Sequence, residues 1–237
     1  MTSARSYVLD ADPDLAELVP DARRDAARQS SLAAAVEVSR GVWDARLEAD
    51  RARDGYGLLV LNGLLIRRVG YGGRYGAELL AGGDLLRPWE FDGDDTIGFE
   101  TGWRVLVPAR MAVLDLGWAE RMGQFPRVGP ALAGRALARS RRLAAMMAIA
   151  QQPRLDDRLW MLFWELADRH GRVHADGVHV DLPLTHEVLS HLVAARRPSV
   201  SGALTKLAGQ GRLRRNGRGW VLNGEPPTDV AGRAVPR

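Results

Sequence analysis

The sequence contains no cysteine, a single lysine (Lys206) and no histidine before His170. Without cysteine, the chain cannot form disulfides, thiolate zinc sites or cysteine-held iron–sulfur clusters. The lack of histidine in the first 169 residues argues against a histidine-ligated metal or haem there. No run of eighteen or more apolar residues is present, and the acidic beginning lacks the apolar core of a secretory signal. We therefore expect a cytoplasmic protein with no membrane-spanning helix.

The charged side chains that are present lie unevenly along the chain. Residues 1–129 carry a net charge of −4, whereas residues 183–222 carry a net charge of +6 with Glu187 as their only acidic residue. The chain's preference for arginine explains the choice of base but not the clustering. A basic C-terminal segment on an acidic body predicts that one domain meets a polyanion.

The first half of the chain predicts a helical extension followed by short strands. Residues 1–31 are polar and helix-prone, and residues 32–125 hold apolar runs punctuated by breakers, at Asn62-Gly63, Gly72-Gly73, Gly82-Gly83 and Pro108. Asn-Gly tolerates positive φ at both turn positions, so these breaks predict hairpins. Short strands with frequent glycine turns are typical of an antiparallel barrel or jelly roll.

A helical period begins at residue 126 and continues to residue 152. Two adjacent stripes, from Leu132 to Ala150 and from Ala133 to Met147, follow i, i+3, i+4 spacing. Two stripes predict burial on more than one side. One side could cover the β domain and the other could pair with a second copy, so we interpret this segment as a dimerisation helix. A helix packed wholly within one subunit is the alternative.

Residues 153–224 predict a compact domain, and residues 225–237 predict a loose tail. The domain contains an amphipathic helix over 155–171 and hairpins at Asp176-Gly177 and Asn216-Gly217. Between the hairpins lies LTHEVLSHLVAARRPSVSGALTKLAGQGRL, which predicts two helices joined by a tight turn. Thr185 suits the N-cap of the first helix, and Pro198 suits the first turn of the second.

The second of these helices predicts contact with DNA. Its core side is apolar, and the side chains left to face outward are small, hydroxylated or basic: Ser199, Ser201, Thr205 and Lys206. Arg197 could pair bidentately with a guanine edge. Arg214, Arg215 and Arg218 lie on the following hairpin, which forms a wing able to follow the phosphate backbone. The alternative is a helical subdomain with a solvated basic face.

At these residues the chain resembles the Crp/Fnr superfamily of bacterial transcription regulators, the catabolite-activator class. The resemblance covers nearly the whole length and implies an α+β fold. It implies an N-terminal antiparallel β jelly roll of the cyclic-nucleotide-binding type, a long dimerisation helix and a C-terminal winged helix-turn-helix. It further implies a homodimer that binds a near-palindromic double-stranded DNA site, with RNA polymerase as a further candidate partner.

The resemblance also implies residue roles. Base-reading positions carry over to Arg196, Arg197, Ser199 and Ser201, and positions near phosphates carry over to Thr185 and His186. Pro198 and Gly202 depart from the family's pattern, where a glutamate and a further arginine are common. We therefore expect a different preferred DNA sequence.

The sensor half departs further from cyclic-nucleotide binders. Arg87-Pro88-Trp89 replaces their Gly-Glu segment, their Arg-Ser pair is missing, and four carboxylates in this stretch would repel a phosphate, namely Asp92, Asp94, Asp95 and Glu100. We expect no cyclic AMP binding. Trp89 and Trp103 are candidate ligand-binding residues for an unidentified effector, and core aromatics are the simpler interpretation.

No cofactor, metal site or catalytic residue is expected. His170, His174 and His179 imitate a metal cluster, but a helix end and a hairpin surface explain them better. The alternative function is a cupin-like β-barrel enzyme, or a small-molecule-binding protein, with an accessory helical domain. The sequence leaves open whether a regulator of this kind would activate or repress.

Overall fold

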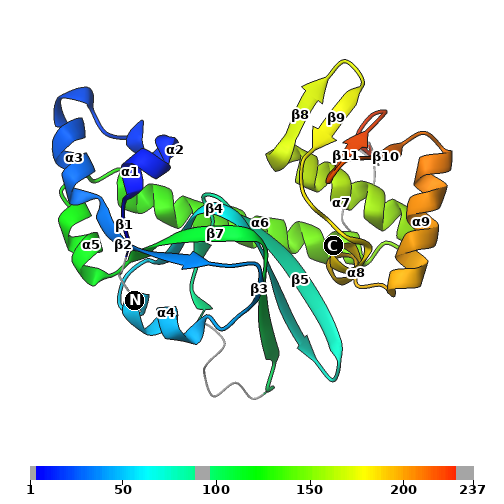
Figure 1. The fold of residues 1–237 in the computed structure, drawn as a ribbon, viewed down its shortest axis with the longest axis horizontal. Coiled ribbons are helices and arrows are strands. Elements are labelled where there is room, and N and C mark those ends of the chain that lie inside the picture. The colour runs from blue at the N-terminus through cyan, green and yellow to red at the C-terminus, as the bar shows by residue number, and fades with distance from the viewer. Residues whose placement is uncertain (1–3, 89–96, 228–237) are drawn as a thin grey trace, which may run out of the picture. The chain divides into compact units, whose positions relative to one another are not determined.

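The computed structural model describes residues 4–88 and 97–227. The chain folds as two compact units, residues 1–143 and 144–237, which are described separately (Figure 1). The domain boundaries expected from the sequence remain predictions. Trp89 and the acidic residues Asp92, Asp94 and Asp95 lie outside the described residues.

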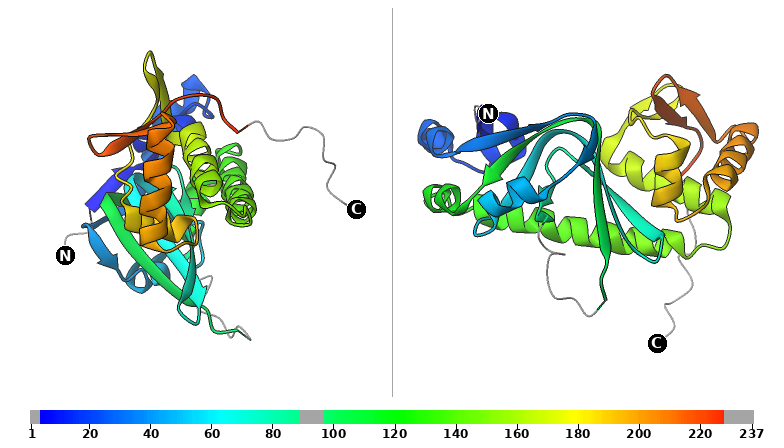
Figure 2. Two further views of the ribbon diagram at one scale, coloured as in Figure 1. Left: turned by 90° about the vertical axis from the view of Figure 1, so that its right-hand side faces the viewer. Right: turned by 60° about the horizontal axis from the view of Figure 1, so that its bottom comes forward.

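The first unit is built around an antiparallel sheet in the order β1-β2-β7-β4-β5, with β3 paired to β7 and β6 paired to β4. Its strands are β1 (Ala4–Tyr7), β2 (Leu32–Val38), β3 (Gly41–Trp43), β4 (Gly57–Tyr71), β5 (Arg74–Ala81), β6 (Leu85–Leu86) and β7 (Glu100–Leu114). Figure 2 shows β4 and β7 curving strongly along their length. The expected antiparallel β roll within an α+β fold is confirmed.

The expected hairpin at Asn62-Gly63 and the expected strand break at Pro108 are wrong. β4 and β7 each run for 15 residues, and their register shifts where the two breakers face each other. Gly63 adopts φ +99°, and a Cβ there would lie 2.5 Å from the Cα of Ala109. Proline cannot donate to a ladder, and glycine accepts positive φ, so both residues suit a β-bulge. Gly72-Gly73 does form the β4–β5 turn.

The N-terminal extension, expected to be helical, begins with a strand. β1 pairs with β2 from Ala4 to Tyr7, which makes the first described residues part of the sheet. The helices that follow are short: α1 (Val8–Ala11), α2 (Pro13–Ala16), η1 (Asp21–Arg23) and α3 (Arg24–Ser30). Val8 and Leu15 of these helices share one core cluster with Trp118 of α5 (Leu116–Met122). The sequence pattern missed β1 because four residues carry too little periodicity.

The roll has a second apolar cluster on the other side of its sheet. Trp43, Leu65, Leu80 and Met111 are buried in this cluster beside α4 (Arg46–Ala52). Apolar layers on both faces explain why β4 reads as a nearly continuous hydrophobic run rather than an alternating strand.

Helix α6 (Val128–Ala150) is attached to the first unit through arginines as well as apolar residues. Arg135, Arg139 and Arg142 follow i, i+4, i+7 spacing and therefore share a face. Each meets a buried carboxylate: Arg135 pairs with Asp12, Arg139 with Glu78 at 2.7 Å, and Arg142 with Asp84 at 2.5 Å. Breaking such a buried pair is costly, because it leaves an uncompensated charge.

In the described part of the second unit that follows α6, helices pack with an antiparallel sheet in the order β10-β11-β9-β8. The elements are α7 (Leu155–His170), β8 (Gly171–His174), β9 (Gly177–Val180), α8 (His186–Leu192), α9 (Arg197–Gly209), β10 (Leu213–Asn216) and β11 (Gly219–Leu222). Both expected hairpins are confirmed. Gly171 follows α7 as expected, but it is extended, with φ −79°, because it already begins β8.

No helix in the described ranges is long and apolar enough to cross a membrane. The cytoplasmic location expected from the sequence remains a prediction.

Candidate nucleic-acid interface

The segment from Thr185 to Gly209 forms two helices and a tight turn. Thr185 caps α8, since its Oγ1 accepts a hydrogen bond of 3.2 Å from the Val188 amide. Ala194 in the turn has φ +50°, the one positive φ of a non-glycine residue that the described part of the chain shows. The turn closes through the Ala195 amide, which donates to the Ser190 carbonyl at 2.9 Å. The small alanine side chain keeps the cost of this left-handed position at about 1–2 kcal/mol.

Helix α9 has a buried apolar side and an exposed side of small residues. Val200, Leu204 and Leu207 are buried, and α9 packs against both α7 and α8. Ser199, Gly202 and Thr205 are exposed. A Cβ built at Gly202 would meet nothing within 4 Å, so another molecule can approach the helix backbone closely there.

Two arginines stand at the beginning of α9. Arg196 is the N-cap residue, Arg197 is the first helical residue, and both are exposed. Within residues 4–88 and 97–227, neither arginine takes part in an ion pair. The adjacent amides and the helix dipole add positive potential, so this end of the helix suits an anion.

Lys206, a sequence-predicted DNA contact, is engaged within the unit. Its Nζ forms an ion pair with Asp156 in the first turn of α7. The Lys206 ammonium is the main reason why the pKa of Asp156 lies below its usual value. Thr205 also bonds internally, since its Oγ1 donates to the Ser201 carbonyl at 3.0 Å.

The β10–β11 wing holds its three arginines differently. Arg215 donates to the Leu184 carbonyl at 2.9 Å, and its guanidinium lies 4.6 Å from the ring centroid of Trp220. These contacts link the wing to the rest of the unit. Arg214 pairs with Asp176 at the tip of the other hairpin. Arg218 sits in the exposed turn. Of the three, Arg218 is the best placed to follow a phosphate backbone.

Asp176 has two hydrogen-bonding neighbours, Arg214 and His179. Its Oδ1 lies 2.8 Å from Nε2 of His179, whose ring lies 4.2 Å from that of His174. The hydrogen bond from His179 is the largest cause of the lowered pKa of Asp176, and Arg214 contributes to the same shift. No group of three or more potential metal ligands is found among the residues described.

His186 and Ser201, which sequence analysis assigned to separate contacts, bond to each other. His186 Nδ1 lies 2.8 Å from Ser201 Oγ. Ser201 Oγ also donates to the Arg197 carbonyl at 3.2 Å. The sequence carried no signal for this pair, because the two residues belong to different helices.

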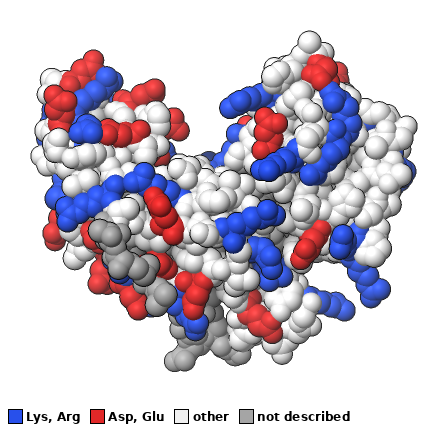
Figure 3. Space-filling model, viewed as in Figure 1, with Lys and Arg blue, Asp and Glu red and all other residues white. Residues whose placement is uncertain are grey.

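The surface of the second unit carries both basic and acidic side chains. Figure 3 shows several basic side chains on the visible face of this unit, with acidic side chains between them. Asp156 and Asp176 neutralise two of the basic side chains, because they form ion pairs with Lys206 and Arg214. In the described part, the basic candidate contacts that are exposed and have neither an ion pair nor a side-chain hydrogen bond are Arg196, Arg197 and Arg218.

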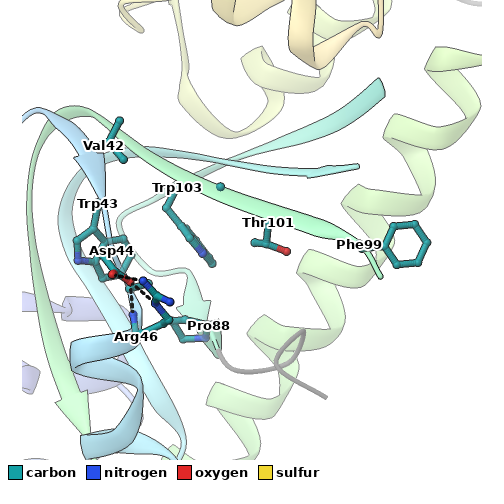
Figure 4. A pocket seen from close by; sticks show the side chains of 10 residues that line it. Val42, Trp43, Asp44, Arg46, Pro88, Phe99, Thr101 and Trp103 are labelled. Carbon is teal, nitrogen blue, oxygen red and sulfur yellow. Dashed lines mark hydrogen bonds and ion pairs between the residues drawn. The ribbon is translucent and has the colours of Figure 1, made fainter. Parts of the chain in front are cut away.

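The first unit contains a separate pocket that Trp103 lines (Figure 4). The cavity has a volume of about 530 Å³, and Trp43, Phe99 and Thr101 also line it. The Trp43 and Trp103 rings meet edge to face with centroids 5.6 Å apart, because the two residues are paired in the β3–β7 ladder. Trp43 was not among the residues expected from the sequence, although a second tryptophan near a strand was a usable signal.

An ion pair between two lining residues, Asp44 and Arg46, also faces this pocket. Arg46 Nη2 lies 2.6 Å from Asp44 Oδ2, and its hydrogen bond lowers the pKa of Asp44 to about 2. Aromatic walls with a few polar groups are typical of small-molecule sites.

Comparisons with known proteins agree with this geometry. Residues 157–225 match the family model of the Crp-like helix-turn-helix domain. A search of the curated proteins finds no match.

Several solved structures share the fold. A CooA variant from Carboxydothermus hydrogenoformans has a TM-score of 0.61 at 16% identity, covering 79% of this chain and 82% of that one. The c-di-GMP-responsive global regulator CLP from Xanthomonas campestris has a TM-score of 0.57 at 17% identity, covering 90% and 100%. A CRP-family transcriptional regulator from Thermus thermophilus has a TM-score of 0.54 at 20% identity, covering 79% and 91%. At these identities the likeness establishes the fold.

Proposed function

We propose, from its Crp-like helix-turn-helix domain and its Crp/Fnr fold, that this chain is a DNA-binding transcription regulator that acts as a homodimer on a near-palindromic site. The observation that carries the proposal is the start of α9. There, two exposed arginines precede a helix face whose small residues allow close approach. This combination suits a helix that enters the major groove by its N-terminal end.

The contacts divide into two classes. Arg197 and Ser199 lie in the first turn of α9, where base edges are normally read. Arg196, the N-cap residue beside them, keeps the base-reading role that the resemblance implies, whereas Arg218 and the capped start of α8 at Thr185 are assigned to phosphates. Lys206 and Arg215 already have partners inside the unit, which favours structural roles for both.

A stripe along α6 supports a homodimer. Ala133, Leu137, Ser140, Ala144 and Met147 are all exposed, and their spacing of four and three residues is the spacing of a two-helix seam. Leu137 and Met147 are 65% and 70% exposed, which is unusual for large apolar residues on one helix. Covering this stripe with the same stripe of a second copy forms an isologous contact.

A two-fold dimer presents two copies of α9. Their targets would then be half-sites about 34 Å apart, one helical turn of DNA. RNA polymerase remains a predicted further partner.

The experiment that tests the proposal is selection of random duplex DNA by the purified full-length protein at near-physiological salt. Enrichment of an inverted repeat is the expected result. A folded protein that enriches no sequence at any salt concentration, with or without candidate effectors, would contradict the proposal.

A second role, small-molecule sensing, is favoured by the pocket of Trp43 and Trp103. An effector that binds there would be a compact, partly aromatic molecule, because tryptophan edges and Phe99 line the cavity. Cyclic AMP is not the expected effector, since Arg87-Pro88 occupies the positions of the Gly-Glu pair in cyclic-nucleotide binders of the family that this chain resembles. Isothermal titration with cyclic AMP should give no heat of binding, and micromolar affinity would refute this.

A further inference from the structure

We propose that His186 and Ser201 form a hydrogen-bonded clamp between α8 and α9 that sets the direction of α9, so that His186 is a positioning residue for DNA reading rather than a phosphate contact. The inference rests on the proposed function and assigns His186 a role other than the one expected from the sequence.

Ser201 Oγ lies within hydrogen-bond distance of two groups, the Arg197 carbonyl at 3.2 Å and Nδ1 of His186 at 2.8 Å. A hydroxyl has one proton to donate and two lone pairs that accept. With that proton on the Arg197 carbonyl, Oγ accepts from Nδ1–H, and a chain of two bonds runs from imidazole to hydroxyl to carbonyl. In the other tautomer the hydroxyl donates to Nδ1, and the bond between the two helices is kept.

These two hydrogen bonds connect the beginnings of α8 and α9. His186 is the first residue of α8, and Ser201 and Arg197 lie one turn apart at the beginning of α9. The clamp thus joins the start of one helix to the first turn of the next, on the side of α9 adjacent to its exposed face. Leu189, Val193 and Val200 are fully buried, but apolar contacts alone are not directional. A directional bond is what holds one helix at a fixed rotation against another.

The clamp also involves Arg197. Its carbonyl accepts the Ser201 hydroxyl, so the clamp ends on the backbone of the residue best placed to read a base. Bidentate reading of a guanine tolerates little displacement of the arginine. Loosening the clamp should therefore weaken specific binding and leave the non-specific, electrostatic part of binding intact.

The test uses two replacements that differ in which imidazole nitrogen they imitate. In His186→Asn the side-chain amide nitrogen can take the place of Nδ1 and donate to Ser201. In His186→Gln the amide reaches the place of Nε2, which would retain a phosphate contact but lose the clamp. His186→Ala loses both, and Arg172→Ala, an exposed residue of β8, is the matched control outside the interface.

Operator binding is measured for the full-length variants by fluorescence anisotropy over a salt series. The clamp predicts that His186→Ala and His186→Gln bind the selected operator about fivefold more weakly per half-site, from one lost hydrogen bond. It predicts wild-type affinity for His186→Asn and an unchanged slope of log K against log salt for all three. Wild-type affinity in His186→Gln, with weaker operator binding in both His186→Ala and His186→Asn, would overturn the clamp and make His186 a phosphate contact.

A DNA-free measurement separates failure of the clamp from failure of the proposed function. Thermal unfolding of His186→Ala, Ser201→Ala and the double variant should be non-additive, with the double variant no less stable than the worse single variant. Additive losses would refute the clamp even if the protein never binds DNA. Non-additive losses in a protein that binds no DNA would keep the clamp and refute the regulator.

Discussion

Replacing Leu137 by alanine tests the dimer most directly, because the effect can be worked from the structure. Leu137 is 65% exposed on α6. Burying a whole leucine side chain is worth about 1.5–3 kcal/mol, so covering the exposed two thirds is worth about 1–2 kcal/mol. A two-fold seam contains the residue twice, which makes the loss about 2–4 kcal/mol per dimer.

The expected result is a rise in the dimer dissociation constant of about 30- to 1000-fold. Sedimentation velocity over a concentration series measures it. Leu116→Ala is the matched control, since Leu116 is 52% exposed on α5 and lies away from the stripe.

The free energy of unfolding of the monomer should change little in either variant, because both side chains are largely in solvent. Equal dissociation constants for wild type, Leu137→Ala and Leu116→Ala would refute the assignment of this stripe to the dimer. Operator binding should weaken together with dimerisation, since a monomer holds one half-site only.

Three further predictions concern the interface and the fold. Arg197→Ala should lose about 1–3 kcal/mol of specific operator affinity while Arg172→Ala loses none, and equal affinities in anisotropy titrations would remove Arg197 from base reading. Because the pKa of Asp156 is lowered in the folded state by its lysine partner, the stability that it contributes is present above its unfolded pKa of about 4 and is lost as pH falls through the lower folded value. Urea unfolding of Asp156→Asn should accordingly depend less on pH in that acidic range than unfolding of the wild type, and identical pH profiles would contradict the pairing. Gly63→Ala should lower the free energy of unfolding by about 2–4 kcal/mol, since the new Cβ would clash with the backbone of β7 at a positive φ. Gly72→Ala, in an open turn, should lower it by about 1–2 kcal/mol in the same urea unfolding experiment.

Local signals in the sequence were sufficient for the helix-turn-helix. The Thr185 cap, the early Pro198 and the apolar spacing of Val200, Leu204 and Leu207 each act within one or two helical turns. Such short-range chemistry is legible without a structure.

Long-range pairing misled the sequence interpretation of the roll. Asn62-Gly63 is a strong hairpin signal in isolation, yet it forms a bulge because Pro108 faces it on a continuous partner strand. The strand β1 was missed for a related reason, as its place in the sheet depends on β2 rather than on its own four residues.

The sequence by itself determined the elements of the helix-turn-helix and its two hairpins, the basic C-terminal segment and the residues at the start of α9, because periodicity, caps and charge are local properties. Only the tertiary structure decided which of those side chains are available. Lys206 meets Asp156 from 50 residues away, and His186 meets Ser201 across two helices. Ion pairs and hydrogen bonds depend on distances of a few ångströms between atoms, and folding, not spacing along the chain, sets those distances.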